Sequence, residues 1–409
     1  MPTSPMQWTN EQTEAIRRAV EWRDSWSPTN DVPDVFRIFG PAGTGKTTMA
    51  SEIVAQVGGL CPYLAFTGKA ALRLQEKGAR TAQTLHSAIY TPKEKSEERL
   101  RKLRAEHAQL QDDPATLPAD LEAAQKAVDA EEDNLARPSF KLNLQSPIRG
   151  TRMVILDEMS MITGEVGIDL MSFGTPVLAL GDPYQLPPVG DSKPYFARSA
   201  PEVLLTEVHR QAAESPILRL ATSVRAGEAP SYGGDDECRV IKKGTLTAAD
   251  LAGFDQILVG RNATRAVINA DVRRLVYDRQ TAYPEKGDKL VCCRNDSDLN
   301  MMNGGLWEVE DVLFADSPDE MVLTLSDSSG RIMSQPIHKH PFDGRKIPLY
   351  DRLERQHFEF GYALTVHKAQ GSEWPNVLVI DESRCFRQDR SKWLYTAVTR
   401  ASQRLTIVR

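Results

Sequence analysis

The stretch "FGPAGTGKTT", residues 39–48, decides the fold of the region around it. It fits the pattern G-x-x-x-x-G-K-[ST], whose glycines allow backbone N–H groups to turn inward around phosphates. An apolar run at residues 35–39 precedes the loop, and residues 48–57 place apolar side chains on one face of a helix. The order of strand, glycine-rich loop and helix predicts an α/β nucleotide-binding domain.

The residues of this loop suit the parts of a nucleoside triphosphate. Lys46 would bring a positive charge to the β- and γ-phosphates, and the hydroxyl of Thr47 would bind Mg²⁺. The partial positive charge at the start of the helix adds to this attraction. We therefore expect ATP and Mg²⁺ as cofactors, with a nucleotide-binding set of Gly40, Gly43, Thr44, Gly45, Lys46, Thr47 and Thr48.

A pair of carboxylates follows a second buried strand. In "TRMVILDEMSMI", residues 151–162, four apolar residues lead into Asp157 and Glu158. Asp157 would complete the Mg²⁺ site, and Glu158 would orient and activate the attacking water. A kinase or a simple nucleotide-binding module would not need the second carboxylate, so the pair favours hydrolysis.

Gln12 has two interpretations. Thr9 and Gln12 stand three residues apart before a helical pattern, which is the spacing of a capping box. An amide just upstream of the phosphate loop can also read the edge of an adenine. The residues by themselves leave both roles open.

Composition excludes several classes of protein. The chain has 409 residues and 41% hydrophobic content, enough for two or three domains. No run of about 18 apolar residues predicts a membrane span, and the first residues lack the pattern of a secretion signal, so we expect a cytoplasmic protein without membrane contact. The five cysteines show no C-x-x-C spacing, which argues against a zinc site or a disulfide framework.

The net charge of −6 comes mainly from one segment, residues 91–136, which contains twelve acidic and seven basic residues. The remaining chain is nearly neutral, so a nucleic-acid partner is not excluded. Leucine and alanine stripes on either side of "DDPATLP", residues 112–118, predict a helical hairpin. We favour a solvated hairpin over a partner-docking arm.

Four later stretches are not explained by one nucleotide-binding domain. They are "LALGDPYQLPPVG" (178–190), "LTEVHRQ" (205–211), "ALTVHKAQGSEWPNVLVI" (363–380) and "LYTAVTRASQRLTIV" (394–408). Together with "DEMS" after the second strand, this motif series resembles that of superfamily 1 helicases. The resemblance is to the 5′→3′ branch with the RecD-like and phage Dda-like enzymes, and it covers most of the chain.

The resemblance implies two RecA-like P-loop motor domains with parallel sheets and ATP between them. By this resemblance Gln12 would read the adenine, and Gln185 would sense the γ-phosphate. Arg210 and Arg400, from the second motor domain, would act as arginine fingers on the transition-state charge. An arginine that crosses the cleft makes domain closure depend on ATP.

A pair of motor domains needs a track, and the resemblance implies single-stranded DNA and single-strand/duplex junctions as partners. Each contact residue by itself could be an ordinary polar loop residue; His367, for example, could be a satisfied turn histidine. The candidate contacts are Thr67, Lys69, Thr84 and His86 in the first motor domain, and Thr365, His367, Lys368 and Ser372 in the second.

Two insertions complete the expected organisation. Residues 91–149 would hold the hairpin and a pin with Phe140 at its tip, either stacking on DNA or buried in the core. Residues 283–351 have the strand and turn rhythm of a small SH3-like β-barrel. The first motor domain would then comprise residues 1–90 and 150–205, and the second 206–282 and 352–409.

The leading hypothesis is an ATP-dependent DNA helicase that moves 5′→3′ on single-stranded DNA and acts as a monomer. One alternative is a translocase that strips bound proteins, or an RNA-directed relative. Another is a non-catalytic subunit whose hairpin docks a replication or recombination complex, but the intact Lys46, Asp157 and Glu158 argue against it. No further cluster of carboxylates predicts a nuclease.

Overall fold

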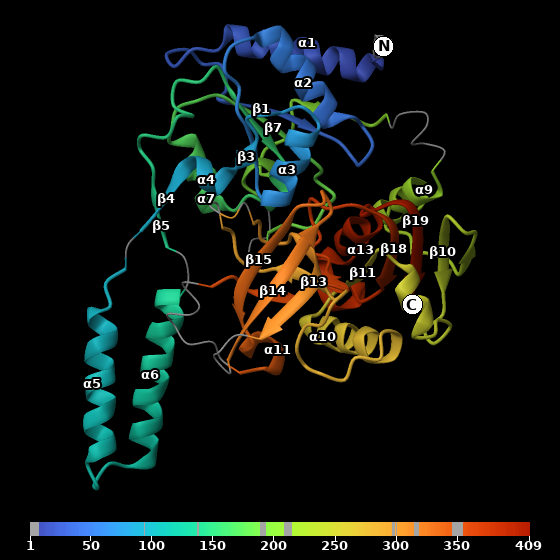
Figure 1. Cartoon of the computed structure of the whole chain (residues 1–409). Coiled ribbons are helices and arrows are strands. Elements are labelled where there is room, and N and C mark those ends of the chain that lie inside the picture. Colours follow the sequence, from blue (N-terminus) through green and yellow to red (C-terminus); the bar gives the residue numbers. More distant parts are fainter. Residues whose placement is uncertain are drawn as a thin grey trace.

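The computed structural model describes residues 8–93, 95–136, 139–188, 194–207, 215–296, 299, 301–314, 319–345 and 355–409. Two α/β units, each built on its own sheet, lie one above the other in Figure 1, and a small antiparallel sheet lies in front of their junction. A helical hairpin projects away from this body. No described helix is both long and apolar enough to cross a membrane.

The first α/β unit has a six-stranded sheet in which every pairing is parallel. The sheet order is β3 (Gln83–Thr84), β2 (Tyr63–Ala65), β6 (Val154–Asp157), β7 (Val177–Gly181), β1 (Val35–Phe39) and β8 (Val203–Leu204). Its helices are α1 (Asn10–Ser25), α2 (Lys46–Val57), α3 (Gly68–Glu76), α4 (Leu85–Ile89) and α7 (Gly164–Met171), with 3₁₀ turns η1 (Met159–Met161) and η2 (Tyr195–Ala197).

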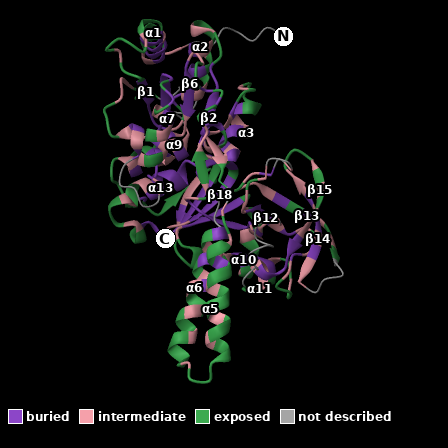
Figure 2. Cartoon of the chain, turned by 90° about the vertical axis from the view of Figure 1, so that its left-hand side faces the viewer, coloured by how far each residue is buried: buried purple, intermediate pink, exposed green. Residues whose placement is uncertain are grey.

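Both faces of this sheet are covered by helices. Side chains of β1 alternate between two cores, so Phe36 and Ile38 pack with α1 and α2, while Val35 and Phe39 pack with α4 and α7. Figure 2 shows the buried interior that results. Burial on both faces explains why the strands read as continuous apolar runs in the sequence.

The second α/β unit repeats this plan, and its strand β11 pairs in parallel with both neighbours. The sheet order is β17 (Ala363–Thr365), β11 (Gln256–Val259), β18 (Trp374–Ile380), β19 (Ala401–Val408), β10 (Cys238–Ile241) and β9 (Gly233–Gly234), the last antiparallel. Its helices are α9 (Pro216–Arg225), α10 (Asn262–Asp271) and α13 (Arg390–Val398), with short turns η3 (Ala249–Gly253), η4 (Val272–Val276) and η5 (Ser383–Asp389).

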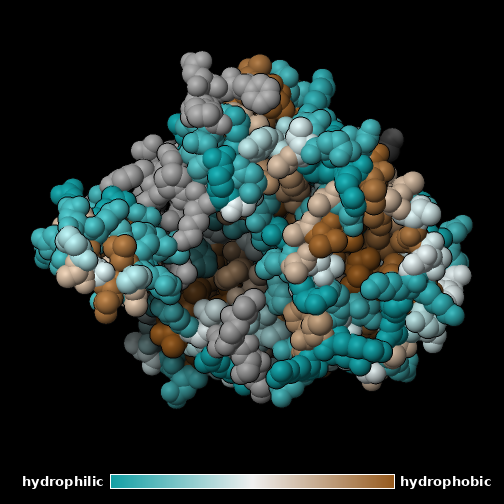
Figure 3. Space-filling model, turned by 90° about the horizontal axis from the view of Figure 1, so that it is seen from below, coloured by the Kyte–Doolittle hydropathy of each residue, from teal (hydrophilic) through white to brown (hydrophobic). Residues whose placement is uncertain are grey.

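The predicted hairpin is confirmed as two helices, α5 (Glu98–Asp112) and α6 (Pro118–Ala136). Its own small core consists of Leu100, Val128 and Leu135. The rest is largely exposed in Figure 2, and its end is mostly hydrophilic when seen from below in Figure 3. The hairpin stands on an antiparallel ribbon of β4 (Tyr90–Pro92) and β5 (Phe140–Leu142).

The small sheet is antiparallel throughout, in the order β15, β14, β13, β12, β16. An isolated bridge between Ile337 and Gln356 brings its two edges together. Four of its strands lie within residues 283–351, the range in which the sequence predicts strands and turns. The fifth strand, β16, lies beyond that range. The bounds are β12 (Lys289–Cys292), β13 (Leu306–Phe314), β14 (Glu320–Asp327), β15 (Ile332–His338) and β16 (Phe358–Phe360), with the short helix α11 (His340–Asp343).

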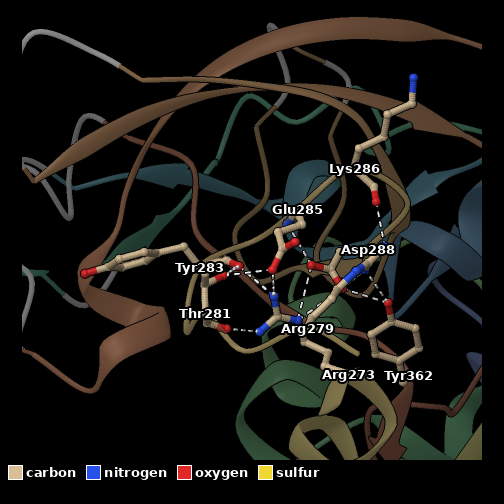
Figure 4. Close-up of polar contacts among 8 residues, drawn as sticks. All are labelled: Arg273, Arg279, Thr281, Tyr283, Glu285, Lys286, Asp288 and Tyr362. Atoms are coloured by element: carbon tan, nitrogen blue, oxygen red, sulfur yellow. Dashed lines mark hydrogen bonds and ion pairs between the residues drawn. The ribbon is translucent and has the colours of Figure 1, made fainter. Parts of the chain in front are cut away.

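A buried ionic network ties this sheet to the second α/β unit (Figure 4). Asp288, which is fully buried, accepts hydrogen bonds from Arg273 at 3.1 Å, from the hydroxyl of Tyr362 at 2.8 Å and from Arg279. The amide of Glu285 donates to the same carboxylate at 2.7 Å. Because two guanidinium groups share one carboxylate, removal of Asp288 would leave buried charge uncompensated.

Candidate nucleotide site and nucleic-acid interface

The phosphate loop has the backbone that its glycines predict. Gly43 and Gly45 have φ values of 83° and 75°, a region that favours glycine. A Cβ atom on Gly40 would lie 2.9 Å from the Cβ of Leu205, so a side chain there would clash. These three glycines let the chain turn tightly between β1 and α2, whose first residue is Lys46.

Lys46 and Thr47 link the loop to its surroundings. The ammonium of Lys46 donates to the carbonyl oxygens of Gly40 at 2.7 Å and Pro41 at 2.9 Å. The hydroxyl of Thr47 donates to Asp157 Oδ2 at 3.2 Å. The loop and the end of β6 therefore meet as expected from the two motifs.

These oxygens fit a magnesium ion. Mg²⁺ in nucleotide sites takes one or two protein oxygen ligands and completes its shell with phosphate oxygens and water. The adjacent oxygens of Thr47 and Asp157 match that donor set. In the part of the chain that the structure describes, no group of three or more His, Cys, Asp or Glu side chains forms a separate metal site.

Glu158 adopts a left-handed backbone conformation, with φ 54° and ψ 45°. This conformation is uncommon outside glycine and turns the chain sharply at the end of β6. Burial raises the pKa of the Glu158 carboxyl and the charge of Asp157 raises it further, while Arg400 and Lys46 oppose these effects. A carboxylate with a raised pKa is better matched to accept a proton from water.

Both α/β units contribute to one cavity of about 410 Å³ around the loop. Arg400, at the start of β19, enters it from the second unit, and its guanidinium bonds the carbonyl oxygens of Ser372 and Thr396, each at 3.0 Å. Burial lowers the pKa of Arg400, and Glu158 acts in the opposite sense. Gln185 is also buried at this cavity, and its Oε1 has no hydrogen-bond partner among the described residues. The lining includes Gly43, Gly45, Lys46, Thr47, Thr48, Asp157, Glu158, Gln185 and Arg400.

Gln12 makes the predicted capping box with Thr9, and its side chain also contacts the phosphate loop. Its Oε1 accepts the Thr9 amide at 3.0 Å, and its Nε2 donates to the carbonyl of Thr44 at 3.0 Å. The capping-box interpretation of Gln12 is therefore confirmed, and its side chain is buried at the edge of the loop; the reading of an adenine stays a prediction. Arg210, the other expected arginine finger, lies outside the described residues.

Two residues of this site were not singled out from the sequence. Asp182, at the end of β7, is 1% exposed and accepts the hydroxyl of Tyr395 at 2.5 Å. Tyr395 lies on α13 of the second unit, and its hydroxyl also accepts the amide of Ala42 at 3.2 Å. Asp182 lies in the motif "GDPYQLPPVG" and Tyr395 in "YTAVTRA". Their place in these motifs is the sequence signal that could have identified them.

Leu186 marks a second contact between the units. Its amide donates to the hydroxyl of Thr396 at 2.9 Å, and its carbonyl accepts Nε2 of Gln370 at 3.0 Å. Arg73 of α3 adds an ion pair with Glu373 at 2.5 Å. Two hydrogen bonds therefore connect the turn after β7 to the second unit.

The candidate DNA contacts of the first unit lie after strands β2 and β3. Thr67 and Thr84 cap α3 and α4, accepting the amides of Ala70 and Ser87. Burial lowers the pKa of His86, whose ring lies 6.2 Å from that of Phe140. Phe140 is 48% exposed, so the core role weighed for it from the sequence is wrong.

The candidate contacts of the second unit follow β17. The Thr365 hydroxyl accepts the amide of Lys368 at 3.3 Å, and Lys368 pairs with Glu359 at 2.8 Å. Burial lowers the pKa of His367, and Ser372 is buried with its carbonyl bonded to Arg400. Thr365 is the last residue of β17, and the other three lie in or directly after the turn at residues 366–371.

Lys69 lines a second cavity. Its ammonium lies 4.5 Å from the centre of the Trp374 ring, at a cavity of about 920 Å³ between the two units and the small sheet. Burial lowers the pKa of Lys69 to about 8, and the charge of Lys289 contributes. None of the other candidate DNA residues lines this cavity.

Comparisons with known proteins agree with this geometry. The family model described as an AAA domain matches residues 7–242, and that of a UvrD-like helicase C-terminal domain matches residues 360–408. The ATP-dependent RecD2 DNA helicase of Deinococcus radiodurans is 29% identical over 401 residues, which covers 90% of this chain and 46% of that protein. The chain thus spans about half the length of this relative.

Solved structures share the fold at low sequence identity. The Pif1 helicase of Candida albicans has a TM-score of 0.53 at 18% identity, covering 99% of this chain and 94% of its own. Pif1 from Bacteroides in complex with ADP-AlF₃ and ssDNA has a TM-score of 0.54 at 17% identity, covering 98% and 92%. Since the AAA-domain model matches more than half of the chain, the chain belongs to the AAA domain family, and its resemblance to RecD-like superfamily 1 helicases is confirmed.

Proposed function

We propose that this chain is an ATP-dependent DNA helicase that moves 5′→3′ on single-stranded DNA and separates duplex DNA. The observation that carries the proposal is that Arg400 of the second unit lines the same cavity as Lys46 and Glu158 of the first. An arginine that reaches the nucleotide from another domain makes closure depend on ATP and reopening depend on hydrolysis. Repeated closure and reopening can move two domains along a strand.

Several residues of the cavity would act in hydrolysis. Lys46 would bind the β- and γ-phosphates, Glu158 would take a proton from the attacking water, and Arg400 would stabilise the transition-state charge. Gln185, whose buried oxygen has no hydrogen-bond partner among the described residues, would sense the γ-phosphate. Thr47 and Asp157 would hold Mg²⁺, which when bound offsets charge on the phosphate oxygens. Gln12 would read the adenine, and Arg210 would be the second arginine finger.

The track would be single-stranded DNA held by the turns after β2, β3 and β17. A structure of Bacteroides Pif1 is described as bound to ssDNA, and the shared fold extends that partner to this chain as a proposal. Phe140, exposed on the ribbon, would be the stacking residue of a pin. The small antiparallel sheet would act as an SH3-like barrel that helps to hold the strand.

We propose that the chain acts as a monomer, since both halves of the ATP cavity come from one polypeptide. The α5–α6 hairpin would be a solvated element, because its few buried side chains pack within the hairpin itself. A docking site for replication or recombination proteins on it is the alternative.

The test compares two duplexes that differ only in a 5′ or a 3′ single-stranded tail, with DNA-stimulated ATPase recorded alongside. We expect ATP-driven unwinding of the 5′-tailed duplex alone, and no hydrolysis by Lys46→Ala. Stimulated ATPase without unwinding of either duplex would instead favour a protein-displacing translocase. Stimulation by RNA in place of DNA would favour an RNA-directed relative, and normal turnover by Lys46→Ala would refute the site.

A further inference from the structure

A single hydroxyl joins the phosphate loop to the second α/β unit. Tyr395, on α13, donates its proton to Asp182 Oδ2 at 2.5 Å and accepts the backbone amide of Ala42 at 3.2 Å. Asp182 directly follows β7 and Ala42 lies within the loop, so both partners belong to the first unit. The contact therefore bridges the cleft in which the nucleotide would bind.

The donors and acceptors of this contact complement one another. Tyr395 is 2% exposed, and its ring lies edge-on to that of Tyr184 with centroids 6.3 Å apart. Burial and the neighbouring Asp182 charge raise the pKa of Tyr395, so its hydroxyl stays protonated and can donate. The proton goes to the carboxylate and an oxygen lone pair accepts the amide. Loss of the hydroxyl would leave the buried Asp182 carboxylate and the half-buried Ala42 amide without this partner.

The position of Ala42 gives the contact its importance. Lys46 bonds the carbonyl oxygens of Gly40 and Pro41, on one side of this short segment, while Tyr395 binds the next amide. Arg400 lies five residues after Tyr395, just beyond the end of α13, and lines the same cavity. Any shift of α13 therefore changes the arginine and the loop contact together.

We propose that Tyr395 is a positioning residue that fixes the phosphate loop to the second unit and so makes the loop respond to domain closure. The proposal goes beyond the helicase assignment, although its kinetic part rests on ATP hydrolysis at this cavity. It predicts that the hydroxyl, rather than the packing of the aromatic ring, carries the effect.

The experiment compares Tyr395→Phe with Tyr362→Phe in the full chain. The control removes the hydroxyl of another buried tyrosine, which donates to a buried carboxylate, Asp288 Oδ1, at 2.8 Å, but does not line the ATP cavity. Two quantities are measured: hydrogen–deuterium exchange of the peptide that contains Ala42, without nucleotide, and the kcat and KM of ATP hydrolysis. Lys46→Ala tests the proposed hydrolysis independently.

We expect faster exchange of the Ala42 peptide in Tyr395→Phe alone. Its kcat should fall by about tenfold to a hundredfold, the usual worth of a hydrogen bond to a charged group, with KM for ATP nearly unchanged. Unchanged exchange, or an equal change in Tyr362→Phe, would overturn the proposal even if the wild type hydrolyses no ATP. Faster exchange with a wild-type kcat would equally refute a positioning role, and the helicase assignment would stand.

Discussion

The hydroxyl of Thr47 lies 3.2 Å from Asp157 Oδ2, although 110 positions separate the two residues in the sequence. The contact joins the start of α2, which follows β1, to the end of β6. The two ends meet although β1 and β6 are not adjacent in the sheet, because only β7 lies between them. Parallel strands present their carboxyl ends at one edge, and this is where nucleotides bind in such sheets. Glu158, one residue further on, is thereby aimed at the same cavity.

Replacing Glu158 with glutamine should abolish turnover and preserve ATP binding. The amide keeps the size of the side chain but cannot accept a proton, and general-base catalysis contributes about 10²- to 10⁴-fold to a rate. Single-turnover hydrolysis and titration with a fluorescent ATP analogue measure the two effects. Normal turnover would remove Glu158 from the mechanism.

Hydrolysis should be lost on acidification at a pH above the ordinary glutamate value of 4.5. Burial and the Asp157 charge raise the pKa of Glu158, so its carboxyl becomes protonated, and inactive as a base, at a higher pH than an exposed glutamate. The measurement is kcat against pH, with circular dichroism to show that the chain stays folded. A rate that stays flat down to pH 4.5 in folded protein would contradict this role.

Phe140→Ala should weaken strand separation and leave DNA-stimulated ATPase intact. Phe140 is 48% exposed beside His86 and Tyr90, which suits stacking on a base, worth about 1–3 kcal/mol. Leu144→Ala is the matched control, because Leu144 is 66% exposed close to the same ribbon but lacks a ring. Equal unwinding by both variants and the wild type would rule out a wedge at Phe140.

Asp288→Ala should destabilise the protein by about 3–5 kcal/mol, because it leaves Arg273 and Arg279 buried without their shared carboxylate. Urea unfolding followed by tryptophan fluorescence measures the change. Asp236→Ala, at an exposed position, should stay within about 0.5 kcal/mol of the wild type. Similar stability of the two variants would show that the network in Figure 4 contributes little.

Replacing residues 95–136 with a short Gly-Ser turn should leave the melting temperature and the ATPase close to those of the wild type. The buried side chains of the hairpin, Leu100, Val128 and Leu135, pack on one another, and the β4–β5 ribbon that supports it would remain. Thermal unfolding and ATPase assays test this. Loss of unwinding or of partner capture in the variant would instead assign the hairpin an active role.

Local spacing was enough to predict a large part of this protein. The phosphate loop follows from its glycines, because Gly43 and Gly45 need positive φ wherever the chain turns so tightly. The hairpin could be predicted from apolar residues at helical spacing. The parallel strands could be predicted from continuous apolar runs, which are typical of strands buried on both faces. These features depend on residues close together in the sequence.

The contacts between units could not be predicted in the same way. Nothing in the spacing of Tyr395 or Asp182 shows that the Tyr395 hydroxyl would contact both Asp182 and the loop, or that the Lys69 ammonium would lie over the Trp374 ring. Such pairs form only when separate surfaces pack, and their geometry depends on the whole fold. The sequence by itself determined which residues could bind a nucleotide. The tertiary structure decided which residues of the second unit reach it, because the distance between side chains on opposite sides of the cleft depends on how the two units pack.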